Sequence, residues 1–138
     1  MRVPSERVAY GRLLWVGPLA GVAAATVNAL IHFGALALGA IPEGFVVSGR
    51  MPVALIPVVV SSFVPALLGA ALLAILGRFA GRPIRTFRIV AGVAVVSSFA
   101  TPITLPGAPV AMISALMVMH VAAAAVIVGV LTTLARKS

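Results

Sequence analysis

The fold of this chain is decided by residues 13–38, which read LLWVGPLAGVAAATVNALIHFGALAL. Only three polar residues, Thr26, Asn28 and His32, interrupt this apolar run. Basic residues precede it, as they precede the apolar region of a signal peptide, but that region has only about 7–15 residues. About 20 apolar residues cross the hydrocarbon core of a bilayer as a helix. The run therefore predicts a retained first membrane span.

The composition extends this interpretation to the whole chain. Of its 138 residues, 62% are apolar, 9% are charged and none is cysteine, and the mean hydropathy is +1.24. So few charged side chains cannot cover a soluble globule, and the absence of cysteine excludes disulfides, thiolate metal sites and iron–sulfur clusters. Four apolar stretches are expected to span the membrane: residues 13–38, 52–76, 87–104 and 109–134. We expect one all-α domain over residues 1–138, an integral membrane four-helix bundle with up-down-up-down topology.

The basic residues are distributed asymmetrically along the chain. Nine of the ten lie in the N-terminal tail (Arg2, Arg7, Arg12), in one short loop (Arg78, Arg82, Arg85, Arg88) or in the C-terminal tail (Arg136, Lys137). Only Arg50 lies in the other loops. Because cytoplasmic loops carry the excess of Lys and Arg, we expect both termini in the cytoplasm and the chain in the plasma membrane. The four loop arginines are expected to face anionic lipid headgroups, and their placement argues against nucleic acid as a partner.

Prolines indicate where the later spans begin and bend. Pro52 is suited to the first turn of a helix and is expected to open the second span. Pro65 has no N–H and displaces the carbonyl of Ser61, so we expect a kink near Ser61. Pro102 would free the carbonyl of Ser98 in the same way. The third span, residues 87–104, is therefore expected to be the shortest.

Two pairs of segments have similar sequences. Residues 59–65 resemble residues 95–102, and these spans cross in opposite directions, as in the inverted repeats of transporters. Residues 52–56 resemble residues 109–113, in spans that run the same way. The two similarities imply different symmetries, so an internal repeat and chance similarity both stay open.

Each predicted span carries polar side chains at a similar depth. Counting 1.5 Å per residue from the outer ends places Asn28 and His120 about 15 Å deep, the serines about 10–14 Å and His32 about 9 Å. Polar groups in hydrocarbon are costly unless they are paired, so we expect them to face the bundle interior. This polar layer consists of Asn28, His32, Ser61, Ser62, Ser97, Ser98 and His120.

The polar layer has three interpretations. Its side chains form hydrogen bonds between helices, or they bind a small lipophilic ligand or quinone-like headgroup, or His32 and His120 ligate haem. Beyond the haem alternative, no cofactor and no metal site is predicted. Copper is disfavoured because Met117 and Met119 are two residues apart and lie on opposite faces of a helix.

No set of residues predicts catalysis. The chain has no aspartate, and Glu6 and Glu43 lie outside the spans, so no Ser-His-acid set can form within the membrane. We expect a non-enzymatic protein that acts through helix packing with itself or with a partner subunit, since Gly17, Gly21 and nearby alanines favour close helix contact. The alternatives are a carrier of a small ligand or cofactor and an oligomeric transporter.

Several motifs resemble those of one bacterial family. They are Gly17-Pro18-Leu19-Ala20 leading to Asn28, Val64-Pro65-Ala66-Leu67-Leu68, Arg82-Pro83 with Phe87-Arg88, and Met119-His120-Val121-Ala122-Ala123-Ala124 within residues 116–131. Over nearly its whole length the chain resembles an uncharacterised family of four-span membrane proteins, a domain of unknown function common in actinobacteria. The resemblance implies this fold and a plasma-membrane location. It implies no activity, ligand or catalytic residue.

Overall fold

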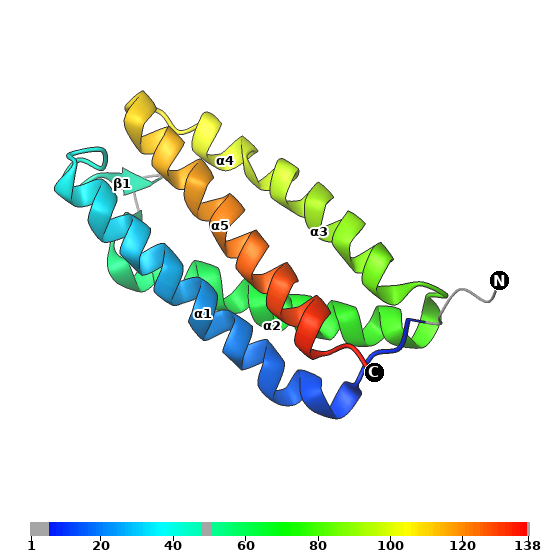
Figure 1. The fold of residues 1–138 in the computed structure, drawn as a ribbon. Coiled ribbons are helices and arrows are strands. Elements are labelled where there is room, and N and C mark those ends of the chain that lie inside the picture. Colours follow the sequence, from blue (N-terminus) through cyan, green and yellow to red (C-terminus); the bar gives the residue numbers. More distant parts are fainter. Residues whose placement is uncertain (1–5, 48–50, 138) are drawn as a thin grey trace.

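Long helices make up most of the protein. The computed structural model describes residues 6–47 and 51–137 (Figure 1). The helices are α1 (Tyr10–Ala37), α2 (Leu55–Phe79), α3 (Pro83–Ser98), α4 (Ala100–Ile103) and α5 (Val110–Leu134). With α3 and α4 taken together, four of these segments are long and apolar enough to cross a membrane. They run alternately in opposite directions, and the first and last described residues lie at one end of the bundle, the end that holds the termini (Figure 1). The predicted all-α four-helix bundle is confirmed.

The connection between α1 and α2 contains the only two strands of the described residues. Strands β1 (Val46–Val47) and β2 (Met51–Pro52) pair antiparallel, with Val46 opposite Pro52. Pro52 therefore lies in a strand, and the prediction that it opens the second span is wrong. The helix begins at Leu55 and has Pro57 in its first turn, where a missing N–H costs no intrahelical bond. It continues unbroken through Pro65, and the kink near Ser61 stays a prediction.

Helix α3 begins four residues before its predicted start at Phe87. Pro83 occupies the first helical position, and the carboxylate of Glu6 accepts hydrogen bonds from the next two backbone N–H groups. The Oε2 atom lies 2.9 Å from the nitrogen of Ile84 and 3.1 Å from that of Arg85. These N–H groups have no partner within the helix, and a negative charge is favourable at a helix N-terminus. Glu6 thus caps a helix that lies far from it in the sequence.

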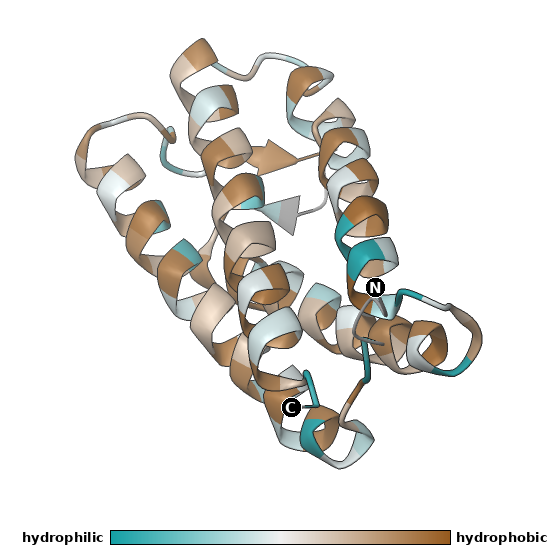
Figure 2. Cartoon of the chain, turned by 45° about the vertical axis from the view of Figure 1, so that its right-hand side comes forward, coloured by the Kyte–Doolittle hydropathy of each residue, from teal (hydrophilic) through white to brown (hydrophobic). Residues whose placement is uncertain are grey.

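The arginines predicted in a loop lie mostly on helices. Arg78 is in the last turn of α2, Arg82 precedes α3, and Arg85 and Arg88 are inside α3. The loop prediction is wrong for Arg85 and Arg88 because the capped α3 starts early, and for Arg78 because α2 extends to Phe79. Hydrophilic residues still gather at the end that holds both termini (Figure 2). Two further basic residues of the prediction, Arg2 and Arg50, lie outside the described residues.

The two terminal segments and α3 are joined at this end of the bundle. The backbone N–H of Ala9 donates to the carbonyl of Ala135 at 2.8 Å, and that of Lys137 donates to the carbonyl of Arg7 at 2.9 Å. Arg88 Nη2 of α3 donates to Thr132 Oγ1 of α5 at 3.1 Å. The end of the bundle that holds the termini is therefore closed by direct hydrogen bonds.

Helix α1 packs closely against α2 through its glycines. A Cβ atom on Gly17 would lie 2.9 Å from the Cβ of Ala70, and one on Gly21 would lie 2.5 Å from Cδ2 of Phe63. Both distances are shorter than ordinary contacts between carbon atoms, so only glycine allows this approach. The glycines from which close helix packing was predicted therefore form contacts within this chain.

Helix α3 touches the bundle mainly near its two ends. Its buried residues, Pro83, Ile84 and Phe87, all lie in the first two turns, where Phe87 joins the core cluster that also contains Leu73 and Leu131. At the other end the helix is interrupted at Phe99, and Pro102 of α4 is buried. A proline at this position cannot bond the carbonyl of Ser98, which explains why α3 ends there.

A second core cluster lies at the end of the bundle away from the termini. Its buried members are Ala35, Ile41 and Met112.

The residues of α3 between its two buried ends belong to neither core cluster, and many of the large side chains there are exposed. This part of α3 borders the space in which the polar layer lies.

The close contact of α1 and α2 is testable with matched glycine variants. We expect Gly17→Ala to lower the free energy of unfolding by about 1–3 kcal/mol, because the Cβ of Ala70 is attached to the backbone and cannot rotate away. Gly34→Ala, on the exposed side of the same helix, meets no atom within 4 Å and should leave stability unchanged or slightly higher. Denaturation in detergent measures both; equal stability of the two variants would contradict the tight contact.

Candidate functional site

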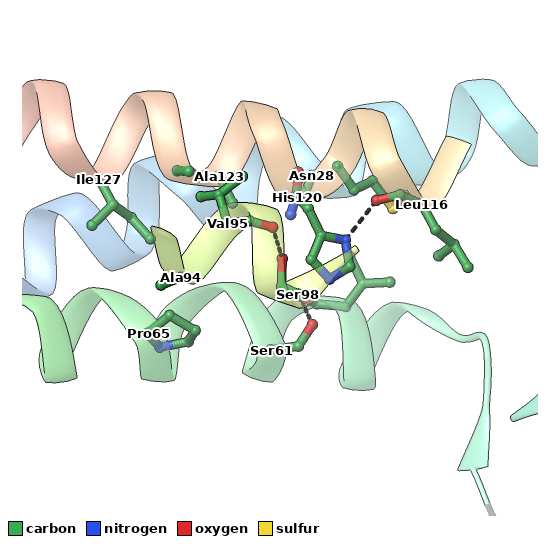
Figure 3. A pocket seen from close by; sticks show the side chains of 13 residues that line it. Asn28, Ser61, Pro65, Ala94, Val95, Ser98, Leu116, His120, Ala123 and Ile127 are labelled. Atoms are coloured by element: carbon green, nitrogen blue, oxygen red, sulfur yellow. Dashed lines mark hydrogen bonds between the residues drawn. The ribbon is translucent and has the colours of Figure 1, made fainter. Parts of the chain in front are cut away.

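A cavity of about 430 Å³ lies among α2, α3 and α5, with one side chain of α1 on its wall (Figure 3). Its lining is mainly apolar and includes small residues that leave space, among them Ala94, Ala123 and Ala124. Four polar residues also line it: Asn28, Ser61, Ser98 and His120. The size and the lining, apolar with a few polar groups, are typical of small-molecule sites.

The cavity brings together residues from all four predicted spans. Asn28 lies nine residues before the end of α1, and His120 lies ten residues into α5, so both are about 15 Å from the ends of their helices. Of the seven predicted residues, four line the cavity and Ser62 contacts one of these four. His32 and Ser97 lie elsewhere.

Asn28 and Ser62 form a buried hydrogen bond between α1 and α2. The hydroxyl of Ser62 donates to the carbonyl of Val58 at 2.7 Å, so its oxygen is left as an acceptor. Asn28 Nδ2 donates to this oxygen at 2.9 Å. Because the one hydroxyl proton of Ser62 is already donated to Val58, the amide of Asn28 must turn its NH₂ group, and not its oxygen, toward Ser62. Asn28 Oδ1 is consequently a buried acceptor without a hydrogen-bond partner.

The tautomer of His120 follows from its contact with its own helix. Nδ1 lies 2.7 Å from the carbonyl oxygen of Leu116. A carbonyl oxygen can only accept, so Nδ1 carries the proton, and Nε2 of the neutral ring is an acceptor. Figure 3 shows the ring close to Ser98 and Ser61, and Phe99 contacts its edge with the ring centroids 6.4 Å apart.

The two remaining residues of the predicted polar layer do not reach the cavity. His32 is buried at 2% exposure, its Nδ1 has no hydrogen-bond partner, and it does not line the cavity that His120 lines. The two imidazoles therefore do not face one space, as axial ligands of one haem would. Ser97 is exposed. Within the described residues, no group of three or more His, Cys, Asp or Glu side chains could hold a metal ion.

The two serines on the cavity each bond a carbonyl of their own helix. Ser61 Oγ donates to the carbonyl of Val58 at 3.1 Å, and Ser98 Oγ donates to that of Val95 at 2.7 Å. Neither hydroxyl is bonded to His120, so the described residues of the cavity present no nucleophile paired with a base.

The alanines that create the space were not identified from the sequence. Alanine is common throughout these helices and gives no signal of a cavity.

The Asn28–Ser62 bond can be tested by removing each neighbouring hydroxyl in turn. We expect Ser62→Ala to lower the free energy of unfolding by about 1–2 kcal/mol, because it leaves the amide of Asn28 buried without an acceptor. Ser61→Ala removes only a bond within its own helix and should cost less than about 0.5 kcal/mol. Unfolding in detergent gives both values, and a loss for Ser61→Ala as large as for Ser62→Ala would count against the interhelical bond.

Comparison with known proteins identifies a family for the chain. No curated protein and no solved structure matches it. The profile of one family, described as a family of unknown function and designated DUF6069, matches residues 8–137. The match includes all four candidate spans and every residue of the cavity. The predicted resemblance to a domain of unknown function is confirmed, and the chain belongs to the family of unknown function DUF6069.

Proposed function

We propose that this chain is an integral membrane protein that binds a small lipophilic molecule, with the polar headgroup of that molecule in the cavity among α2, α3 and α5. One observation carries the proposal. Asn28, Ser61, Ser98 and His120 come from separate helical segments and border a single space of about 430 Å³ inside otherwise apolar helices. Polar groups in hydrocarbon are costly unless they are paired, and those that face the interior of a bundle often mark a ligand or substrate site.

The polar side chains at the cavity support ligand binding because most of them form no bond between helices. Ser61, Ser98 and His120 each bond a carbonyl of their own helix. Among the four polar residues on the cavity, only Asn28 bonds a second helix, through Ser62. Helix packing therefore accounts for one of the four residues, and ligand binding would account for the other three.

The interpretation as a helix-packing protein has less support than ligand binding. It depended on small residues that would contact another subunit, yet Gly17 and Gly21 contact α2 of the same chain. The haem alternative also has less support, because His32 and His120 do not share a cavity. A non-enzymatic binder or carrier of a lipophilic molecule agrees best with the arrangement of the side chains.

We further infer that the chain lies in a bacterial plasma membrane with both termini in the cytoplasm. Arg78, Arg82, Arg85 and Arg88 lie at the end of the bundle that holds the termini. Cytoplasmic ends of membrane proteins are enriched in such residues, and each contributes about 1 kcal/mol of attraction to anionic headgroups. This orientation places the hairpin of β1 and β2 on the outer side.

Ligand retention tests the proposed function. Protein purified in mild detergent from its own membrane should carry a small molecule that mass spectrometry detects near equimolar amounts. Ala124→Leu fills the cavity and should reduce the retained amount at least about tenfold, an effect of about 1.4 kcal/mol. Ala125→Leu makes the same change at the neighbouring, exposed position and should have no effect. Equal retention by the two variants, or none by the wild type, would contradict the proposal.

The orientation is testable because the natural chain contains no cysteine. Single cysteines are introduced as Glu43→Cys, in the connection after α1, and Gly81→Cys, between α2 and α3; both positions are exposed. In intact cells a membrane-impermeant maleimide should label only Glu43→Cys, and after lysis it should label both. Labelling of Gly81→Cys in intact cells, with Glu43→Cys protected, would show the opposite orientation.

A further inference from the structure

Three of the four polar residues around the cavity share one hydrogen-bonding character. Ser61 and Ser98 each direct their hydroxyl proton to a carbonyl of their own helix, at 3.1 Å and 2.7 Å. Water does not compete for these protons in hydrocarbon, so a hydroxyl that turned away would lose its bond. Each serine therefore offers the cavity oxygen lone pairs and no proton.

His120 has the same character for an independent reason. The proton of His120 is on Nδ1, opposite the carbonyl of Leu116, so Nε2 is an acceptor. Asn28 differs, because its oxygen Oδ1 is buried away from the cavity and its Nδ2 donates to Ser62. Three of the four polar residues on the cavity, Ser61, Ser98 and His120, thus present acceptors.

We infer that the cavity selects a neutral hydrogen-bond donor: a lipophilic molecule whose headgroup carries a hydroxyl, such as a phenol or a quinol. A quinone presents only carbonyl acceptors and would form no bond with Ser61, Ser98 or His120, so a quinol fits these three residues and the oxidised quinone does not. An ammonium headgroup lacks its counter-charge, because neither Glu6 nor Glu43 lines the cavity. This inference depends on the proposed ligand-binding function and specifies the chemistry of the ligand.

The volume of the cavity agrees with such a headgroup. At about 430 Å³ the cavity lies toward the small end of ligand sites, which span about 300–1,000 Å³. Its apolar lining from α3 and α5, including Val95, Ala123 and Ile127, suits an aromatic ring or short alkyl chain. The acceptors would then bond the hydroxyl of that molecule.

The test compares two probes of equal size on the full-length protein in lipid nanodiscs. 4-Butylphenol carries a hydroxyl donor, and 4-propylanisole has the same number of non-hydrogen atoms but carries an ether that only accepts. Binding is measured as a saturable rise of the unfolding temperature, with empty nanodiscs as the blank. We expect the phenol to bind at least about tenfold more tightly than the anisole, as expected for loss of one buried donor.

Matched variants assign the selectivity to the cavity. Ser98→Ala and His120→Leu each remove one acceptor and should weaken phenol binding by about threefold to tenfold, while anisole binding stays unchanged. Ser97→Ala alters the neighbouring, exposed hydroxyl and should change neither affinity. Ser98→Ala keeps the test valid if His120→Leu does not fold, because Ser98 bonds only its own helix.

The possible results separate the inference from the function on which it depends. Equal affinity for the two probes, with both lost in Ala124→Leu, would overturn the donor selectivity and leave ligand binding in place. Absence of saturable binding by either probe would overturn both proposals and indicate a cavity that holds only water. Phenol binding could also stay unchanged in all three cavity variants, Ser98→Ala, His120→Leu and Ala124→Leu. That result would place the phenol outside the cavity and overturn the inference.

Discussion

The rest of the structure depends on the close approach of α1 to α2 at Gly17. A single methyl group there would lie 2.9 Å from the Cβ of Ala70, so the distance between the two helices is set by the absence of a side chain. Gly17, Gly21 and Asn28 share one face of α1 because they are spaced by four and seven residues. The contact at the glycines therefore brings Asn28 within hydrogen-bonding distance of Ser62. Helix α1 also packs against α5, which leaves α3 at the edge of the bundle.

The peripheral position of α3 accounts for the cavity. Its N-terminal end is held by Phe87 in the core, by the Glu6 cap and by the bond from Arg88 to Thr132. Its other end is held by buried Pro102, after the break at Phe99. Between these points α3 contributes small or exposed side chains, and space remains between it and α5. The cavity thus results from anchoring a helix at two ends and leaving its middle unpacked.

The local pairing of polar groups decides which hydrogen-bonding groups border this space. Among the residues of the predicted polar layer, the bond from Asn28 to Ser62 is the hydrogen bond that joins side chains of two helices. The hydroxyls of Ser61 and Ser98 and the Nδ1 proton of His120 are all directed to carbonyls of their own helices. Groups that satisfy their donors locally leave their acceptors toward the cavity. The chemistry of the site follows from this local pairing rather than from any charged residue.

The sequence by itself determined the number of apolar helices and the positions of the polar residues along them, because both depend only on residue type and on the rise per residue of a helix. Tertiary structure decided the early start of α3, since the Glu6 carboxylate that caps it lies 78 residues away from Ile84 in the chain. It also decided which serine of each pair reaches the cavity. Neighbouring residues on a helix point about 100° apart, so only the rotation of α2 and α3, set by packing, places Ser61 and Ser98 on the cavity and Ser62 and Ser97 elsewhere.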